Sequence, residues 1–75
     1  MALGREAIDG HLLQVLHYLL VEGSVSRTAR RLNQSQPAVS SALRRLREIT
    51  GDQLLVRGRG GMTPTERGAA LLEPV

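Results

Sequence analysis

The most regular pattern in the chain is a run of leucines at helical spacing near its N-terminus. In GHLLQVLHYLLVE, residues 10–22, five leucines fall on one side of an α-helix: Leu12, Leu13, Leu16, Leu19 and Leu20. Asp9 is suited to cap the start of this helix, and Gly23 is suited to end it. We therefore predict a first helix over residues 10–22 that buries its leucine face.

A shorter pattern of the same kind follows in SVSRTARRL, residues 24–32. Its apolar positions recur at i, i+4 and i+7: Val25, Ala29 and Leu32. Either Ser24 or Ser26 could cap a helix here, and we favour Ser26. Asn33 and Gln34 then form a short polar connector to the next segment.

The third segment, residues 36–50, predicts a helix with well-defined ends. Ser35 is its expected cap, Pro37 falls in the first turn, and Gly51 follows the last apolar position. One side of this helix is apolar: Val39, Ala42, Leu43, Leu46 and Ile49. The centre of the opposite side holds Pro37, Ser41, Arg44 and Glu48, with Gln36 and Ser40 on one flank and Arg45 on the other.

After Gly51 the pattern changes from helix to hairpin. We predict a short strand around Leu54–Arg57, a glycine-rich tip, and a second strand at residues 62–63. Arg57 and Arg59 make this tip cationic, and no nucleotide-binding motif surrounds the glycines. Thr63 and Glu66 have the spacing of a capping box, with Pro64 as the first residue of a final helix.

These elements predict a mainly α fold of the winged helix-turn-helix type, because two short helices joined by a tight turn precede a small hairpin. We expect residues 1–63 to form this domain and residues 64–75 to begin a linker helix. The 75 residues contain no Phe or Trp and a single Tyr, so the core must be built from aliphatic side chains.

Charge adds a candidate partner to this picture. All ten basic residues are arginines, and residues 24–61 contain eight of them against two acidic residues, a net charge of +6. The flanking segments carry a net charge of −3. A cationic middle between anionic ends favours a polyanionic partner, because guanidinium groups pair with phosphates and base edges through two hydrogen bonds. A solvated, arginine-rich surface is the alternative.

The polar side of residues 36–50 suits a helix that enters the major groove of DNA. Ser40 and Ser41 are small enough to allow close approach, Gln36 can pair with an adenine edge, and Arg44 can reach guanine or phosphate. Pro37 offers an apolar surface to a thymine methyl group. Pro37 and Ser35 also have helix-start roles that need no DNA. Arg45 and Arg47 fit equally well as solvated helix charges.

Two other classes of function fit the sequence less well. A protein–protein adaptor would need an exposed apolar patch, and the arginine-rich face argues against one. An enzyme would need a catalytic group, but His11 and His17 are the only histidines, and no Ser/His/Asp arrangement accompanies them. We expect no catalytic residue, no metal site and no cofactor. The longest apolar run, Val15–Val21, is too short to cross a membrane, and no signal-peptide pattern is present.

The motifs SQPAVS, residues 35–40, and GDQLLVR, residues 51–57, are specific enough to suggest a family. From about Ile8 to Leu72 the sequence resembles the DNA-binding domain of LysR-type transcriptional regulators. Thr28 replaces the first of two alanines usual in that family, and Leu55 replaces the usual Phe. Near position 41 the family commonly has a Lys or Arg, whereas this chain has Ser41. The base preference of other members therefore does not transfer to this chain.

The resemblance implies a bacterial, cytoplasmic transcription factor that binds interrupted palindromes in double-stranded DNA as a homodimer or tetramer. By position it assigns DNA contacts to Ser26, Arg27, Gln34, Ser35, Gln36, Pro37, Ser40, Ser41 and Arg44, with Arg57 and Arg59 at the wing. A linker helix beginning near Pro64 would pair two subunits through its small and apolar residues: Ala69, Ala70, Leu71 and Leu72. We expect a small-molecule effector to act only through a C-terminal domain that this sequence lacks, which would make the chain an N-terminal fragment.

Overall fold

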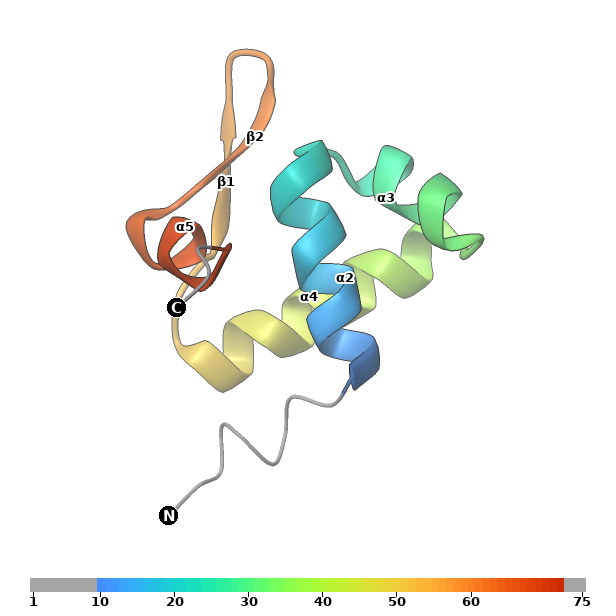
Figure 1. Cartoon of the computed structure of the whole chain (residues 1–75), viewed down its shortest axis with the longest axis horizontal. Coiled ribbons are helices and arrows are strands. Elements are labelled where there is room, and N and C mark those ends of the chain that lie inside the picture. Colours follow the sequence, from blue (N-terminus) through green and yellow to red (C-terminus); the bar gives the residue numbers. More distant parts are fainter. Residues whose placement is uncertain (1–9, 73–75) are drawn as a thin grey trace.

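Within residues 10–72 of the computed structural model, three helices precede a two-stranded hairpin and a short further helix (Figure 1). The structure describes residues 10–72, except for the side chain of Leu72. The elements in chain order are α2 (Gly10–Glu22), α3 (Val25–Leu32), α4 (Gln36–Thr50), β1 (Leu55–Gly58), β2 (Gly61–Pro64) and α5 (Glu66–Leu72). Pro64 thus belongs to β2, and the last helix begins two residues later than predicted.

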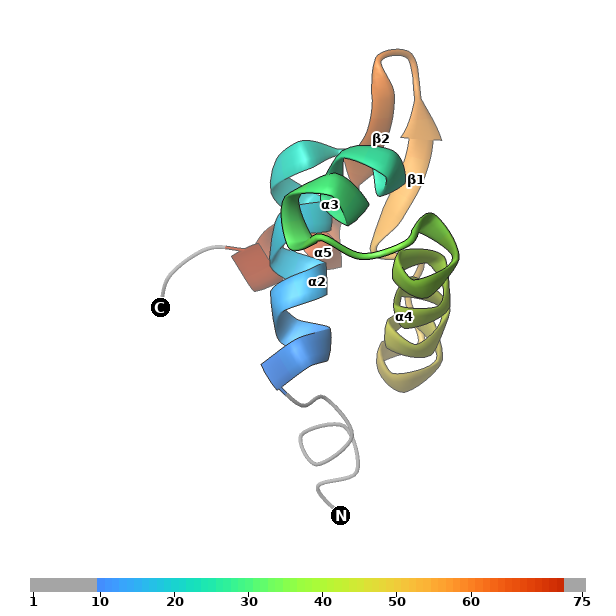
Figure 2. The same cartoon turned by 90° about the vertical axis from the view of Figure 1, so that its right-hand side faces the viewer.

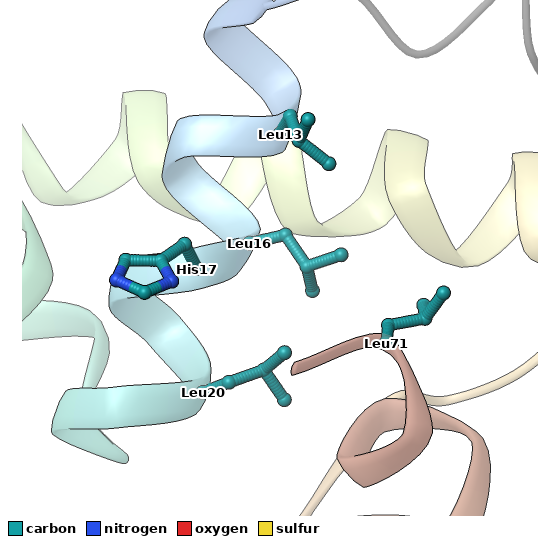
Figure 3. A pocket seen from close by; sticks show the side chains of 5 residues that line it. All are labelled: Leu13, Leu16, His17, Leu20 and Leu71. Atoms are coloured by element: carbon teal, nitrogen blue, oxygen red, sulfur yellow. The ribbon is translucent and has the colours of Figure 1, made fainter. Parts of the chain in front are cut away.

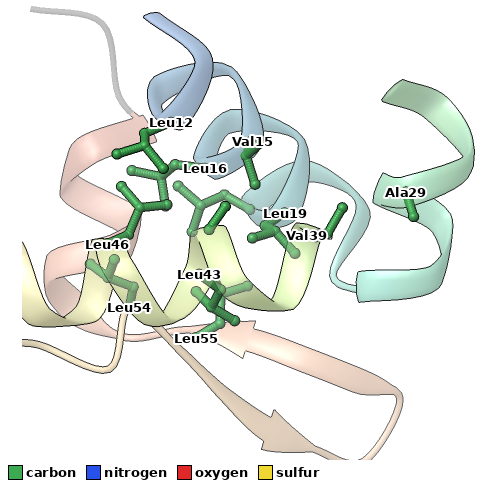
Figure 4. Close-up of a cluster of buried hydrophobic side chains, with 12 residues drawn as sticks. Leu12, Val15, Leu16, Leu19, Ala29, Val39, Leu43, Leu46, Leu54 and Leu55 are labelled. Carbon is green, nitrogen blue, oxygen red and sulfur yellow. The ribbon is translucent and has the colours of Figure 1, made fainter. Parts of the chain in front are cut away.

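The core is formed by aliphatic side chains from α2 and α4, by Ala29 of α3, and by Leu54 and Leu55 where the chain enters the hairpin (Figure 4). Leu19, Leu46, Leu54 and Leu55 are fully buried. The predicted helix over residues 10–22 is confirmed, but the prediction that Leu13 is buried is wrong, since this side chain is 57% exposed. Leu13 lies at the edge of the leucine face, whose other four leucines are buried. Asp9, the predicted cap, lies outside the described residues.

The start of α3 differs from the prediction. Ser24, and not Ser26, is the N-cap, because its extended backbone lets Oγ accept a hydrogen bond from the Arg27 N–H at 3.1 Å. Ser26 lies in the first turn, where its hydroxyl shares a 3.1 Å hydrogen bond with that of Ser24. Asn33 ends the helix in the left-handed conformation, with φ of 57°.

Helix α4 has the ends that its sequence predicts. The Ser35 hydroxyl accepts a hydrogen bond from the Ala38 N–H at 3.2 Å, and Pro37 lies in the first turn. Gly51 follows the helix with φ of 71° and donates its N–H to the Arg47 carbonyl at 2.8 Å. The predicted apolar side is buried, although Ile49 at its C-terminal end is only partly covered.

The hairpin is antiparallel, with Leu55 opposite Pro64 and Gly58 opposite Gly61, so Arg59 and Gly60 form a two-residue turn. The predicted strand start at Leu54 is wrong, because this fully buried residue has φ of +67° and cannot continue a strand. The second strand is longer than predicted, and its Met62 N–H donates to the Gly23 carbonyl at 3.0 Å. We call residues 55–64 the wing.

The predicted capping box at Thr63 and Glu66 is also wrong. The backbone is still extended at Pro64, and Thr65 caps α5 by accepting a hydrogen bond from the Gly68 N–H at 3.1 Å. The Thr63 hydroxyl instead lies near the Val56 carbonyl across the hairpin. Thr65 thus has the capping role that the sequence predicted for Thr63, the other threonine of Thr63–Pro64–Thr65.

A small polar network surrounds Leu54 at the base of the wing. One carboxylate oxygen of Asp52 accepts hydrogen bonds from the Leu54 N–H and from the Thr65 hydroxyl, both at 2.7 Å. The Leu54 carbonyl accepts the Thr65 N–H at 2.9 Å. The pKa of Asp52 is lowered from its usual value near 3.8. The main cause is the hydrogen bond from the Thr65 hydroxyl, followed by the one from the Leu54 amide, with a smaller contribution from the charge of Arg67.

Gly68 packs against the same point. A β-carbon at this position would collide with the Leu54 carbonyl oxygen and would lie 3.3 Å from Leu20 Cδ2. We therefore expect Gly68→Ala to destabilise the fold by about 1–3 kcal/mol through overpacking, after allowing for the better helix propensity of alanine. Urea unfolding measures the change. Gly60→Ala is the control, because a β-carbon there has no heavy atom within 4 Å; equal stabilities of the two variants would contradict the expectation.

The lowered pKa of Asp52 predicts a pH effect with a defined sign. The ionised carboxylate stabilises the folded state above the unfolded pKa near 3.8, and this contribution is lost as the pH falls below that value through the folded pKa. Asp52→Asn keeps an acceptor but removes the charge, so it should unfold at lower urea concentration than the parent chain at pH 7. The difference should shrink below pH 3.8. A difference that stays constant over the whole pH range would assign the effect to shape and not to charge.

Candidate DNA-binding interface

The exposed side of α4 carries most of the residues that the sequence singled out. Ser35, Gln36, Pro37, Ser40, Ser41 and Arg44 are all exposed. In Figure 2, α4 and the wing lie on the same side of the molecule. The structure therefore places the polar side of α4 and the cationic hairpin where one extended partner can contact both.

Three segments that are distant in sequence meet in a crevice beside α4. Its walls come from the turn before α3 and the start of α3, from the start of α4, and from the half of the wing next to its turn: Gly23, Ser24, Val25, Ser26, Gln36, Arg57, Gly61 and Met62. The hydrogen bond from Met62 to the Gly23 carbonyl fixes the wing against the turn before α3. Gly23 allows this close approach, because its φ is +66° and a β-carbon would lie 2.9 Å from the Met62 carbonyl oxygen.

Other predicted contact residues lie apart from this crevice. Ser41 lines a separate hollow with His11 and Arg45, on the flank of α4 away from Gln36. Arg59 is exposed in the turn at the wing tip, and Arg27 is exposed on α3 beside Glu22 and Arg30. The predicted contacts therefore form a broad surface that spans α3, α4 and the wing.

Besides Ser26, whose hydroxyl shares a hydrogen bond with that of Ser24, two of the predicted contact residues have structural partners or are partly covered. The Ser35 hydroxyl is engaged in capping α4. Gln34 is half-buried, and its Oε1 is buried without a hydrogen-bond partner among the described residues. Of the two, Ser35 is the more accessible to a partner, since its side chain is exposed and its hydroxyl can still donate a hydrogen bond.

The structure also brings in residues that the sequence reasoning did not assign to the site. Ser24, Gly23 and Met62 line the crevice. A serine at the start of a helix can accept a hydrogen bond from the amide three residues later, so the sequence does contain a signal for Ser24 as the cap of α3. No local pattern brings Met62 to the crevice, because its place there depends on how the wing packs on the turn at Gly23.

The arginines divide into two groups. Arg31 lies 3.6 Å from the Glu22 carboxylate, and its guanidinium carbon is 5.6 Å from the centre of the Tyr18 ring. Arg47 donates hydrogen bonds to two backbone carbonyls, so its interpretation as a solvated charge is wrong. The others in the central segment are exposed and make no ion pair within residues 10–72: Arg27, Arg30, Arg44, Arg45, Arg57 and Arg59.

A second surface of different character lies between α2 and α5. Leu13, Leu16, Leu20 and Leu71 project toward one another across an apolar groove that His17 also borders (Figure 3). Leu13 and Leu71 are more than half exposed, at 57% and 51%. Ala69 is exposed as well, whereas the side chain of Leu72 lies outside the described residues. None of the groove residues belongs to α3, α4 or the wing.

Residues 10–72 contain no cluster of three or more His, Cys, Asp or Glu side chains that could hold a metal ion. Within the same range, no helix has the length and apolar character needed to span a membrane. The two histidines lie on α2, on its exposed surface.

Comparison with known proteins identifies the architecture. The family model described as bacterial regulatory helix-turn-helix protein, lysR family, matches residues 11–69. A crystal structure of a probable transcriptional regulator from Pseudomonas aeruginosa is similar with a TM-score of 0.84 and 35% identity, over 91% of this chain and 23% of that one. The structure of ArgP from Mycobacterium tuberculosis is similar with a TM-score of 0.76 and 32% identity, over 87% of this chain and 24% of that one.

Curated relatives agree with this match. The transcriptional activator NahR of Pseudomonas putida is 52% identical over 68 residues, and NagR of a Ralstonia species is 46% identical over 68 residues. Each alignment covers 91% of this chain and 23% of the relative, so the chain spans about a quarter of their length. The chain belongs to the lysR family of bacterial regulatory helix-turn-helix proteins, and its winged helix-turn-helix is the DNA-binding domain of a LysR-type transcriptional regulator.

Proposed function

We propose that this chain reads a palindromic operator in double-stranded DNA, with α4 in the major groove and the wing on the adjacent minor groove or backbone. The observation that carries the proposal is the crevice that joins the start of α3, the start of α4 and the half of the wing next to its turn. It brings Ser26, Gln36 and Arg57 to one surface from three separate elements. Such convergence suits a duplex, because neighbouring phosphates and base edges are contacted together.

The side chains of α4 provide the means of base recognition. Gln36 and Ser40 lie on the flank nearer the wing, and the exposed Arg44 lies near the centre of the outer side. Glutamine can pair with adenine and arginine with guanine through two hydrogen bonds in the major groove, while serine leaves room for close approach. Arg27 and Arg30 of α3 and Arg57 and Arg59 of the wing are exposed and make no ion pair within residues 10–72, so they would neutralise phosphates on either side of α4.

The same proposal includes the wider biology of the family. The domain would act in the bacterial cytoplasm as part of a longer regulator, and a small molecule would control it through a C-terminal domain. Assembly would be a homodimer, or a tetramer in the full-length protein. The relatives' short alignments support a modular arrangement of this kind, since the match is confined to about a quarter of their length.

Two substitutions separate base recognition from wing contacts. On a duplex selected from random sequence, Arg44→Ala should cost about 1–3 kcal/mol and relax the preference at one base pair. Arg59→Ala should weaken binding to all duplexes and reduce the slope of log affinity against log salt by about 0.9, as expected for one lost phosphate contact. Fluorescence anisotropy at several salt concentrations measures both effects.

The parent chain provides the control for this experiment, since its affinity should fall steeply with salt and should favour the selected duplex. A flat salt response, or no enrichment of any sequence, would reject DNA reading by this surface. Equal and sequence-independent losses for the two variants would instead show that α4 is not the recognition element.

The apolar groove supports the homodimer part of the proposal. Helix α5 is only seven residues long within the described chain, and a helix so short needs a packing surface to be stable. One side of it packs on α2, while Leu71 and Ala69 stay exposed. We propose that a second copy covers this exposed side about a two-fold axis, which would place the two α4 helices about one duplex turn or a multiple apart.

Leu71→Gln tests the dimer without disturbing the core, because Leu71 is exposed. Sedimentation of the parent chain should show weak association alone and two subunits bound cooperatively to a full palindrome. In Leu71→Gln the cooperativity should fall while affinity for a single half-site is retained. Val21→Gln is the matched control, since Val21 is similarly exposed, at 57% against 51% for Leu71, but lies outside the groove. One subunit per palindrome at saturation would defeat the proposal.

A further inference from the structure

The side chain of Arg47 connects α4 to the first strand of the wing. Its Nε donates a hydrogen bond to the Gln53 carbonyl at 2.9 Å, and its Nη2 donates to the Leu55 carbonyl at 3.0 Å. Both distances are those of well-formed hydrogen bonds, and both come from one rigid, planar guanidinium. Arg47 is thus a two-point attachment between the helix and the backbone at the base of the wing.

The two carbonyls lie on either side of Leu54, whose backbone has φ of +67°. This conformation is unfavourable for a leucine, so its surroundings must hold it in place. Arg47 binds the backbone immediately before and after Leu54, while Asp52 accepts the Leu54 N–H. The direction in which β1 leaves the core is therefore fixed from α4 by Arg47.

The orientation of the wing base matters because a small rotation there displaces the tip of the wing by a larger distance. Four residues separate the start of β1 from the turn at Arg59, which corresponds to a length of about 13 Å. A rotation of about 10° at the base would move the tip by about 2 Å, enough to break a hydrogen bond to a phosphate. The second strand has its own attachment, from Met62 to Gly23, but that attachment leads to the turn before α3 and not to α4.

Arg47 also lies on the flank of α4 that holds Gln36 and Ser40, because residues separated by four and eleven positions share one side of a helix. We propose that Arg47 is a positioning residue that sets the distance and angle between the base-reading flank of α4 and the wing. Its guanidinium acts on the protein backbone and need not touch DNA. The inference rests on the proposed DNA-reading function, and it assigns to Arg47 the coupling between the two parts of the interface.

Arg47→Lys tests this role, because lysine keeps the charge and most of the stem but cannot donate in the fork that reaches both carbonyls. In the parent chain, Arg59→Ala should weaken binding to the selected duplex by roughly tenfold, whereas in the Arg47→Lys background the same change should cost less than about threefold. Arg45→Lys is the matched control, since the Arg45 side chain is exposed on the same helix and makes neither of the two hydrogen bonds that Arg47 makes. There the tenfold effect of Arg59→Ala should persist.

A DNA-free measurement makes the test independent of binding. The chain has no cysteine, so Ser40→Cys and Gly60→Cys would carry the only two spin labels, one on α4 and one at the wing tip. The distance distribution between the labels should broaden or shift in Arg47→Lys and stay unchanged in Arg45→Lys, with both variants keeping the helical circular dichroism of the parent.

The outcomes separate the inference from the proposed function. An unchanged distance distribution together with additive losses in Arg47→Lys and Arg59→Ala would overturn the positioning role. Full binding by Arg47→Lys with the full effect of Arg59→Ala would do the same. A lack of specific DNA binding by the parent chain would reject the proposed function, whereas the label distances would still decide whether Arg47 holds the wing.

Discussion

The packing of aliphatic side chains between α2 and α4 is the interaction on which the other elements depend. Leu19 of α2 and Leu46 of α4 are fully buried, and Leu54 and Leu55 join them from the start of the wing. Because the chain lacks Phe and Trp, no single large side chain fills this space. Around this core, backbones approach closely at Gly23 and Gly68: a β-carbon would lie 2.9 Å from the Met62 carbonyl oxygen at Gly23 and would collide with the Leu54 carbonyl oxygen at Gly68.

This core also determines which residues reach the surface. The apolar side of α4 faces α2, so its polar side is turned outward as a consequence of packing. The wing follows from the burial of Leu54 and Leu55, which ties the start of the hairpin to the end of α4. The core thus positions the binding surface of α3, α4 and the wing, although most side chains of that surface are not part of the core.

Much of this arrangement is predictable from the sequence because it depends on local periodicity. The spacing of leucines specifies α2, and Ser35, Pro37 and Gly51 mark the ends of α4 without reference to the rest of the chain. The exposed side of α4, with Gln36 and Arg44, follows from the same periodicity.

Errors in the prediction occur where two neighbouring residues could each cap a helix, as with Ser24 against Ser26 and Thr65 against Thr63. In both cases the strand or turn that precedes the helix decides, and it is fixed by tertiary packing. The positive φ of Leu54 and the use of Arg47 as a backbone attachment have no sequence signature, since each depends on contacts between separate elements.

The apolar groove between α2 and α5 has a thermodynamic consequence for the whole domain. Leu16 and Leu20 line the groove and also belong to the core under α4. The groove exists only while α2 and α5 are packed together, so any partner that fills it binds the folded state. By mass action, its binding free energy adds to the free energy of unfolding. The melting temperature of this domain should then depend on the concentration of whatever covers the groove, so that folding and assembly are a single linked equilibrium.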